Sequence, residues 1–381
     1  MNMNKAINTI NTTASALSTS VRLSLLAIAA AMALAAFPSS AKDNPNKTQH
    51  YIQINLVSDQ AGVAQIQDTN LVNAWGVSFS SGSPFWISDN GTGKSTLYAV
   101  TNGVVTRNPL VVNIPGDGNP TGQFFNGTPA FHTNLFIFVS EDGTISGWRP
   151  ALGVNAEILA QRTNAVYKGV TLATNSTGPI LLAANFAEAT VDVYDTNTTL
   201  IAQLSDSSAP SGYAPFNVQN IGGLVIVTFA KQDDAKHDDV PGRGHGLIDV
   251  LDPQTGQFVR FATGSDAGGK LKEINSPWGV ALAPDSFGKN GGDLLVGNFG
   301  SGTIMTFNAE GKFQGLLKAH RHGAVTIDGL WALTFGNNGS AGDPDTLFFT
   351  AGPDGESHGL FGILAPFSNK GDQDDQGEDN D

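Results

Sequence analysis

The sequence contains no cysteine and little charge. None of its 381 residues is Cys, and Asp, Glu, Lys and Arg together make up 14% of the chain. Without cysteine no disulfide framework can hold the fold, so stability must come from a hydrophobic core, which a chain of this length can bury. Segments with helical periodicity are also missing. This absence argues against a helical bundle, a coiled coil and the helix ring of a TIM barrel.

Basic residues are fewer than acidic ones. There are 20 Lys and Arg against 34 Asp and Glu, which gives a formal net charge of −14. Such a chain repels phosphate groups, so we expect no nucleic-acid partner. The familiar catalytic motifs are absent too: there is no G-x-S-x-G elbow, no phosphate-binding loop, no H-E-x-x-H pair and no EF-hand. The motifs therefore leave open whether the protein is an enzyme.

Long apolar runs are absent with one exception. LSLLAIAAAMALAAF at 23–37 follows Lys5 and Arg22 and is followed by PSSA. This pattern predicts a signal peptide over 1–41, a linker over 42–50 and export to the periplasm or the extracellular space. The alternative is a membrane anchor, but the run is shorter than the roughly 20 residues that a span needs, so we expect no integral membrane protein after cleavage.

Glycine, by contrast, is abundant, and the chain repeats itself. It has 45 Gly and 18 Pro, and short alternating apolar runs lie between the turns that these residues favour. The runs group into six units of roughly fifty residues. The units are 73–101, 128–150, 167–195, 214–252, 276–308 and 328–366.

Each of the first five units is followed by one more short run. These runs are 109–114, 157–161, 199–204, 258–262 and 313–317. Four strands in each of six units predict an all-β, six-bladed β-propeller. The sixth unit lacks its fourth strand, and the isolated run YIQINLV at 51–57 should supply it and close the ring. We therefore expect the propeller to span 51–366 as a monomer, followed by a disordered acidic tail over 367–381.

Several segments within these units resemble a known family. SEDGTISGW, LLAANFAEATVDVYD, GYAPFNVQNIGG, NSPWGVALAP and LFFTAGPDGESHGLFG are similar to an uncharacterised family of exported bacterial NHL-like β-propeller proteins, some of which carry a PEP-CTERM sorting tail. The resemblance implies the fold and export. It implies no activity, and this chain has no Pro-Glu-Pro motif after Pro366.

The loops between the second and third strands of the blades should surround the mouth of the central channel, where propellers usually bind ligands. The candidate ligand-binding residues are Asn90, Glu141, Asn185, Lys231, Asp233, His237, Asn298 and Asp328. Asn90, Asn185 and Asn298 stand at matching places in three units, which also fits a purely structural role in turns.

The longest of these loops, within 229–246, is rich in Asp and His. Asp233, Asp238 and Asp239 are candidate ligands for Ca²⁺ or another divalent cation, because carboxylate oxygens suit hard ions. A salt-bridged surface loop and a partner-binding loop are the alternatives. Three tryptophans, Trp75, Trp278 and Trp331, mark the first strand of three units and should pack between blades. A ring-stacking surface for carbohydrate is the alternative for them.

Two functions follow from these features. The first is a binding or scaffold protein that holds a protein, glycan or small-molecule ligand through its channel-mouth loops. The second is a metal-dependent hydrolase or lactonase with a divalent ion in the channel, for which Glu141, Asn185, Asn298 and Asp328 would be the oxygen donors.

Overall fold

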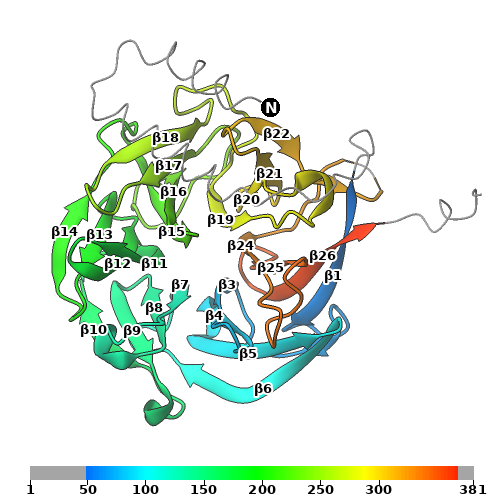
Figure 1. Ribbon diagram of the computed structural model, residues 1–381, viewed down its shortest axis with the longest axis horizontal. Coiled ribbons are helices and arrows are strands. Elements are labelled where there is room, and N and C mark those ends of the chain that lie inside the picture. Colours follow the sequence, from blue (N-terminus) through cyan, green and yellow to red (C-terminus); the bar gives the residue numbers. More distant parts are fainter. Residues whose placement is uncertain (1–48, 322, 368–381) are drawn as a thin grey trace, which may run out of the picture. The chain divides into compact units, whose positions relative to one another are not determined.

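Six sheets arranged around a central axis make up the part of the chain that the computed structural model describes, residues 49–321 and 323–367 (Figure 1). Five of the sheets have four strands, and each runs in chain order from the axis outward. The predicted six-bladed propeller of four-stranded blades is therefore confirmed. The predicted signal peptide and all of the predicted tail after Phe367 lie outside the described residues.

The first five blades follow one another along the chain. Blade 1 is β3 (Ala74–Ser78), β4 (Phe85–Asp89), β5 (Lys94–Thr101) and β6 (Val104–Asn113), and blade 2 is β7 (Pro120–Phe125), β8 (Phe136–Ser140), β9 (Thr144–Trp148) and β10 (Glu157–Gln161). Blade 3 is β11 (Tyr167–Asn175), β12 (Gly178–Asn185), β13 (Thr190–Tyr194) and β14 (Leu200–Leu204). Blade 4 is β15 (Tyr213–Ile221), β16 (Leu224–Lys231), β17 (Leu247–Leu251) and β18 (Phe258–Thr263), and blade 5 is β19 (Pro277–Leu282), β20 (Leu294–Asn298), β21 (Ile304–Phe307) and β22 (Phe313–Leu316). Short 3₁₀ turns lie at Asn90–Thr92, Phe131–Thr133, Pro150–Leu152 and Gly288–Asn290.

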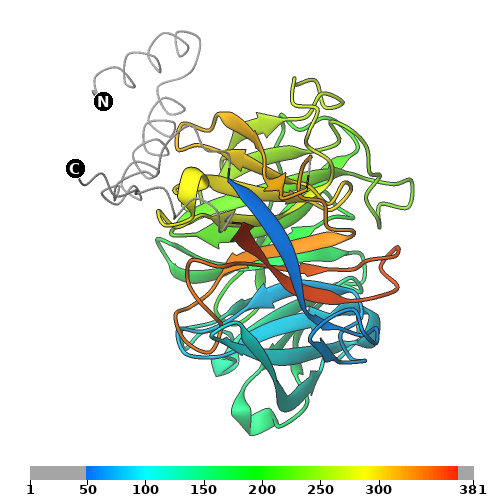
Figure 2. The same cartoon turned by 90° about the vertical axis from the view of Figure 1, so that its right-hand side faces the viewer.

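Blade 6 joins the two ends of the propeller. It consists of β24 (Leu330–Phe335), β25 (Leu347–Ala351), β26 (Leu360–Phe367) and β1 (His50–Ser58). Strand β1 pairs antiparallel with β26 from His50 opposite Phe367 to Ser58 opposite Leu360, and Figure 2 shows the two strands side by side. The short strands β2 (Ile66–Gln67) and β23 (Lys318–Ala319) pair parallel with β1. The N-terminal strand closes the ring as the sequence predicts.

The Gly-Val motif of the units has a steric cause. A Cβ atom on Gly76 would lie 2.4 Å from the carbonyl oxygen of Thr121, and one on Gly279 would lie 2.4 Å from that of Trp331. Both neighbours belong to the first strand of the adjacent blade, so a side chain at either glycine would push two blades apart near the axis.

One outer strand differs from its prediction. Strand β6 begins at Val104, five residues before the expected run, because Asn102 and Gly103 have φ angles of 52° and 75° and form a two-residue hairpin turn. An Asn-Gly pair with both φ angles positive is a favoured connection between antiparallel strands. The strand accommodates Pro109 at an irregularity in its register with β5. Within the described chain, no helix is long and apolar enough to cross a membrane.

Candidate functional site

Two repeated positions of the blades lie near the axis of the propeller, and each supplies one set of residues. The first set is the second residue of the first strand in each blade. Its members are Trp75, Thr121, Lys168, Ala214, Trp278 and Trp331. The second set is the first residue after the second strand, and its members are Asn90, Glu141, Phe186, Gln232, Phe299 and Gly352.

The three tryptophans of the first set pack against one another. Trp75 and Trp331 are stacked with ring centroids 3.6 Å apart, and Trp278 meets both rings edge-on at 6.3 and 5.9 Å. Phe299 stacks on the other side of the pair, 3.8 Å from Trp331. We call these four residues the aromatic plug. They come from blades 1, 5 and 6 and meet near the axis, so the tryptophans pack between blades as predicted.

Burial also removes the stacking alternative for the tryptophans. Trp75 and Trp331 are each 1% exposed and Trp278 is 4% exposed, so none offers a free ring face to a carbohydrate. Bulky rings from three blades converge where a hollow channel would otherwise expose apolar side chains to water, and their burial stabilises the centre of the propeller.

Lys168 occupies the same strand position in blade 3 as the tryptophans in their blades. Its side chain is 2% exposed, and its ammonium makes ion pairs with Glu141 and, at 3.2 Å, with Asp238. The ammonium also lies 5.3 Å from the centroid of the Trp75 ring, within the range of a cation–π contact. Burial by itself lowers the pKa of Lys168, but the charges of Glu141 and Asp238 outweigh it, so the pKa is raised and the ammonium stays protonated.

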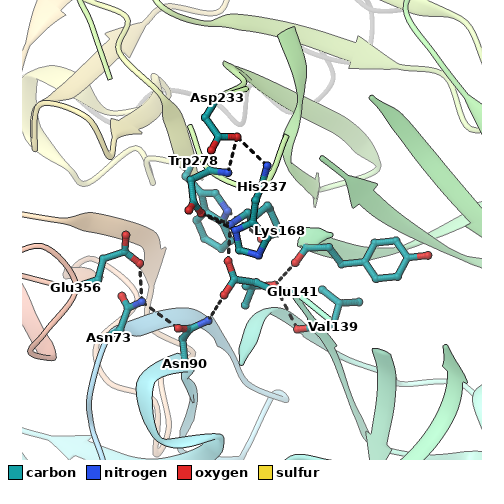
Figure 3. A network of polar contacts seen from close by, with 12 residues as sticks. Asn73, Asn90, Val139, Glu141, Lys168, Asp233, His237, Trp278 and Glu356 are labelled. Atoms are coloured by element: carbon teal, nitrogen blue, oxygen red, sulfur yellow. Dashed lines mark hydrogen bonds and ion pairs between the residues drawn. The ribbon is translucent and has the colours of Figure 1, made fainter. Parts of the chain in front are cut away.

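An amide chain links Glu141 of blade 2 through blade 1 to Glu356 of blade 6 (Figure 3). The Nδ2 of Asn90 donates to Glu141 at 3.0 Å, and the Nδ2 of Asn73 donates to Asn90 at 3.2 Å and to Glu356 at 2.7 Å. The indole nitrogen of Trp331 in turn donates to Asn73 at 2.8 Å. Residues from blades 1, 2 and 6 and the aromatic plug thus form one network, which the Lys168 ion pairs extend to blades 3 and 4. We call this network and its neighbouring loop residues the channel-mouth site.

The carboxylates of this site have perturbed acidities. Burial raises the pKa of Glu356, and the nearby Glu141 and Asp238 raise it further against the opposing effects of Asn73 and Lys168. Burial raises the pKa of Asp239 to about 6, although the charge of Lys168 opposes the change. For Asp238, burial acts upward too, but Lys168 and His237 lower the pKa below its ordinary value. Carboxyl groups with opposed shifts in one place are typical of functional sites, though structural ion-pair networks produce them as well.

The long loop between β16 and β17 contributes one side of the site. Its Asp233 accepts hydrogen bonds from the backbone nitrogens of His237 and Asp238, at 2.9 and 3.3 Å, and so holds the turn. The Nδ1 of His237 lies 3.0 Å from the Oδ1 of Asp238. The Oδ2 of Asp239 and the hydroxyl of Ser276 are buried and, within the described residues, have no hydrogen-bond partner.

The predicted metal ligands do not form one ligand set. Within the described residues, the group that could hold an ion is Glu141, His237 and Asp238, whose ligand atoms all lie within 4.8 Å of one another. Asp238 belongs to both sets. Asp233 instead binds backbone amides, and Asp239 lies beside Ser276.

Of the predicted ligand-binding residues, the structure brings Asn90, Glu141 and His237 together at the channel mouth. Four others make local contacts elsewhere. Asn185 donates to Glu188 and Asp192, Asn298 binds the backbone around 273–275, Lys231 pairs with Asp266, and the exposed Asp328 accepts from the backbone of Asp354.

The predicted match of Asn90 with Asn185 and Asn298 is wrong by one residue. Asn185 and Asn298 end their second strands, and the residue in that place in blade 1 is Asp89, which pairs with Ala74. A shift by one residue turns a side chain to the other face of a strand. Asn90 therefore follows its strand and joins the network, whereas Asn185 and Asn298 remain fully buried.

Asn73, Lys168 and Glu356 are site residues that sequence reasoning missed. Lys168 had a signal: the copy of the unit at 167–195 begins YKGV where the units at 73–101 and 276–308 have AWGV and PWGV. A lysine at a position that other blades fill with a buried tryptophan predicts a buried cation near the axis. Asn73 and Glu356 carry no comparable signal.

No family model matches the chain. The curated protein "Uncharacterized protein R648" of Acanthamoeba polyphaga mimivirus is 30% identical over 330 residues, covering 81% of this chain and 78% of its own length. A second protein of that virus, "Uncharacterized protein L690", is 28% identical over 334 residues, covering 81% of this chain and 84% of its own.

Solved structures with similar architecture are more distant. A streptogramin B lyase aligns with a TM-score of 0.49 and 10% identity over 85% of this chain and 100% of its own. A putative gluconolactonase aligns with a TM-score of 0.42 and 15% identity over 65% of this chain and 79% of its own. Likeness at this level says nothing about function.

The expected bacterial relatives with a sorting tail are not among these proteins: the similar sequences are viral, and the comparisons give no support to the PEP-CTERM part of the resemblance. The propeller part of the resemblance holds. With 30% identity over most of both chains, this propeller belongs to the family of the mimivirus protein R648.

Proposed function

We propose that this protein is an exported binding protein whose channel-mouth site holds a ligand through a positively charged organic group, such as an amine or a guanidinium. The observation that carries the proposal is the charge of the site. The ammonium of Lys168 pairs with Glu141 and Asp238. Two further carboxylates lie close by: burial and the charge of Asp238 raise the pKa of Asp239, and burial and the charges of Glu141 and Asp238 raise that of Glu356.

Other basic residues of the neighbourhood do not offset this charge. Lys231 is ion-paired with Asp266 at 2.8 Å, away from the site. Lys236 and Arg243 are exposed and make no ion pair with the described residues of the site. Like charges held together in a partly buried place favour a ligand that brings the opposite charge.

Accessible carboxylates make contact with such a ligand feasible. The side chains of Asp238 and His237 are 66% and 46% exposed, whereas Lys168 beneath them is buried. A cationic group can therefore approach Asp238 from the solvent side without displacing the lysine. The packed rings of the aromatic plug lie next to Lys168, so we expect binding at the mouth rather than deeper along the axis.

A thermal-shift experiment tests the proposal. Spermidine and argininamide serve as cationic probes, with glutamate and glucose as anionic and neutral controls. We expect the cationic probes alone to raise the melting temperature, because a ligand that binds only the folded state stabilises it by RT ln(1 + [L]/Kd). The double substitution of Asp238→Asn with Glu356→Gln should remove the effect.

Asp354→Asn is the matched control for these substitutions. Asp354 lies in the same loop as Glu356, but its side chain is 84% exposed and belongs to no contact of the site network. It should leave the probe-dependent shift unchanged. If the cationic probes stabilise the double variant as much as the parent, or stabilise neither, binding through these carboxylates is refuted.

A second candidate, the metal-dependent hydrolase, rests on the proximity of Glu141, His237 and Asp238. Imidazole with carboxylates suits a divalent ion that activates water. Hydrolysis of a simple lactone or aryl ester, abolished by a chelator and restored by Zn²⁺ or Ca²⁺, would support it. Absence of turnover with every added metal would remove it.

A further inference from the structure

The ammonium of Lys168 lies against Glu141 and Asp238, two of the three residues that could hold a metal ion at the channel mouth. The ligand atoms of Glu141, His237 and Asp238 lie within 4.8 Å of one another, as an ion would need them. The ammonium of Lys168 contacts Glu141 through Oε1 and Asp238 through Oδ1 at 3.2 Å. A carboxylate oxygen that accepts a hydrogen bond from an ammonium is less available to a metal ion, and two cations in one cluster repel each other.

The position of Lys168 in the repeat keeps its ammonium in this cluster. It is the second residue of β11, the place at which β3, β19 and β24 carry the tryptophans of the aromatic plug. The backbone carbonyl of Lys168 accepts a hydrogen bond from the indole nitrogen of Trp278 at 3.0 Å. With the backbone held and the side chain 2% exposed, the lysine has no free route to solvent.

We propose that Lys168 is a built-in cation that takes the place of a divalent metal ion between Glu141 and Asp238, and so restricts the channel-mouth site to organic cations. The restriction to organic cations rests on the proposed function. The exclusion of metal ions does not.

Geometry holds the ammonium between the two carboxylates. It contacts Glu141 and, at 3.2 Å, Asp238, and it lies 5.3 Å from the centroid of the Trp75 ring, within the range of a cation–π contact. The protein should therefore be indifferent to chelators in its stability.

Metal titration of five proteins tests the proposal. Isothermal titration with Zn²⁺ would compare the parent, Lys168→Met, Lys168→Arg, His237→Ala, and Lys168→Met combined with His237→Ala. Methionine removes the charge and keeps an unbranched side chain of similar length, whereas arginine keeps the charge. We expect Lys168→Met to bind one equivalent at least ~10-fold more tightly than the parent, because the opposing charge is gone.

The other variants serve as controls. Lys168→Arg should show no gain, and the added His237→Ala should abolish the gain because it removes the imidazole ligand. His237 is 46% exposed, so its replacement leaves the core intact. Stoichiometric Zn²⁺ binding by the parent that disappears in His237→Ala alone would overturn the proposal, and this comparison stands even if Lys168→Met does not fold. A folded Lys168→Met variant without the gain would overturn it too.

The two ideas can fail separately. Spermidine binding without a metal gain in Lys168→Met would leave the proposed function and refute the built-in cation. A metal gain without spermidine binding to the parent would leave the built-in cation and refute the organic ligand.

Discussion

The ion pair of Lys168 with Glu141 predicts an unusual pattern of stability in a double-mutant cycle. Lys168→Met leaves Glu141 without its cation, and Glu141→Gln leaves a buried ammonium that retains only Asp238, at 3.2 Å. Removal of one partner from a buried ion pair costs about 3 to 5 kcal/mol, whereas replacement of both is often nearly neutral. The double variant should therefore be more stable than Lys168→Met or Glu141→Gln alone.

The structure adjusts the size of this effect. The Glu141 side chain is 11% exposed, so water reaches it only slightly, and the amide of Asn90 can still donate to a glutamine oxygen at that position. The remaining contact with Asp238 offsets part of the loss in Glu141→Gln. We expect about 2 to 3 kcal/mol of destabilisation for Glu141→Gln, somewhat less than the full loss of a buried partner.

Equilibrium unfolding in urea measures the free energy of unfolding of the four proteins, provided that each gives a single cooperative transition. Glu310→Gln, on an exposed turn, is the matched control and should change the free energy by less than ~0.5 kcal/mol. Effects of Lys168→Met and Glu141→Gln that add up within ~0.5 kcal/mol would refute the reasoning, because additivity means that the two charges do not interact in the folded state.

Further predictions concern the fold and its ends. Burial raises the pKa of Asp89 well above its ordinary value, so the folded protein keeps a proton that the unfolded chain releases, and the free energy of unfolding falls as the pH rises above ~4. The variant Asp89→Asn should therefore have a higher melting temperature than the parent at pH 7.5 and the same melting temperature at pH 4. Leu56→Ala on the closing strand β1, which is 0% exposed, should cost about 2 to 5 kcal/mol of unfolding free energy, whereas Ile201→Ala, 51% exposed on β14, should cost less than ~1 kcal/mol. Truncation after Phe367 should leave the melting temperature unchanged. If the predicted signal peptide is cleaved, mass spectrometry of the protein expressed with its full N-terminus should find a chain that begins directly after Ala41; a full-length chain would contradict the signal peptide.

The fold could be read from the sequence because a propeller repeats one hydrophobic pattern. Each blade needs the same alternation of apolar residues, and four of the six have a glycine in close contact with the next blade at the position of Gly76, so errors in one unit are corrected by the others. Ring closure was predictable for a related reason: the last unit was one strand short, and the run at 51–57 was one strand too many. Strand β6 was misplaced because the Asn102-Gly103 turn is local to blade 1 and has no counterpart to reveal it.

The site was only partly predictable, because it consists of differences between blades rather than of their shared pattern. Asn90 and Glu141 were found through their loops. The amide chain that joins them to Asn73 and Glu356 depends on side chains 17 to 283 residues apart in sequence, and no spacing rule describes such contacts. An alignment of the repeats that is wrong by one residue is enough to misplace a site. It matched Asn90, which lies at the channel mouth, with Asn185 and Asn298, which are buried at the ends of their strands.

Lys168 connects these two lessons. A position that carries a buried tryptophan in three blades is constrained by packing, and a lysine there costs free energy unless its charge is offset. Glu141 and Asp238 supply the offset, but only because the first residue after β8 and the β16–β17 loop reach the axis at the height of Lys168. The departure from the repeat in blade 3 therefore requires matching departures in blades 2 and 4. We therefore expect the ligand specificity of a propeller of this family to depend on residues that differ from the repeated pattern and contact one another across blades.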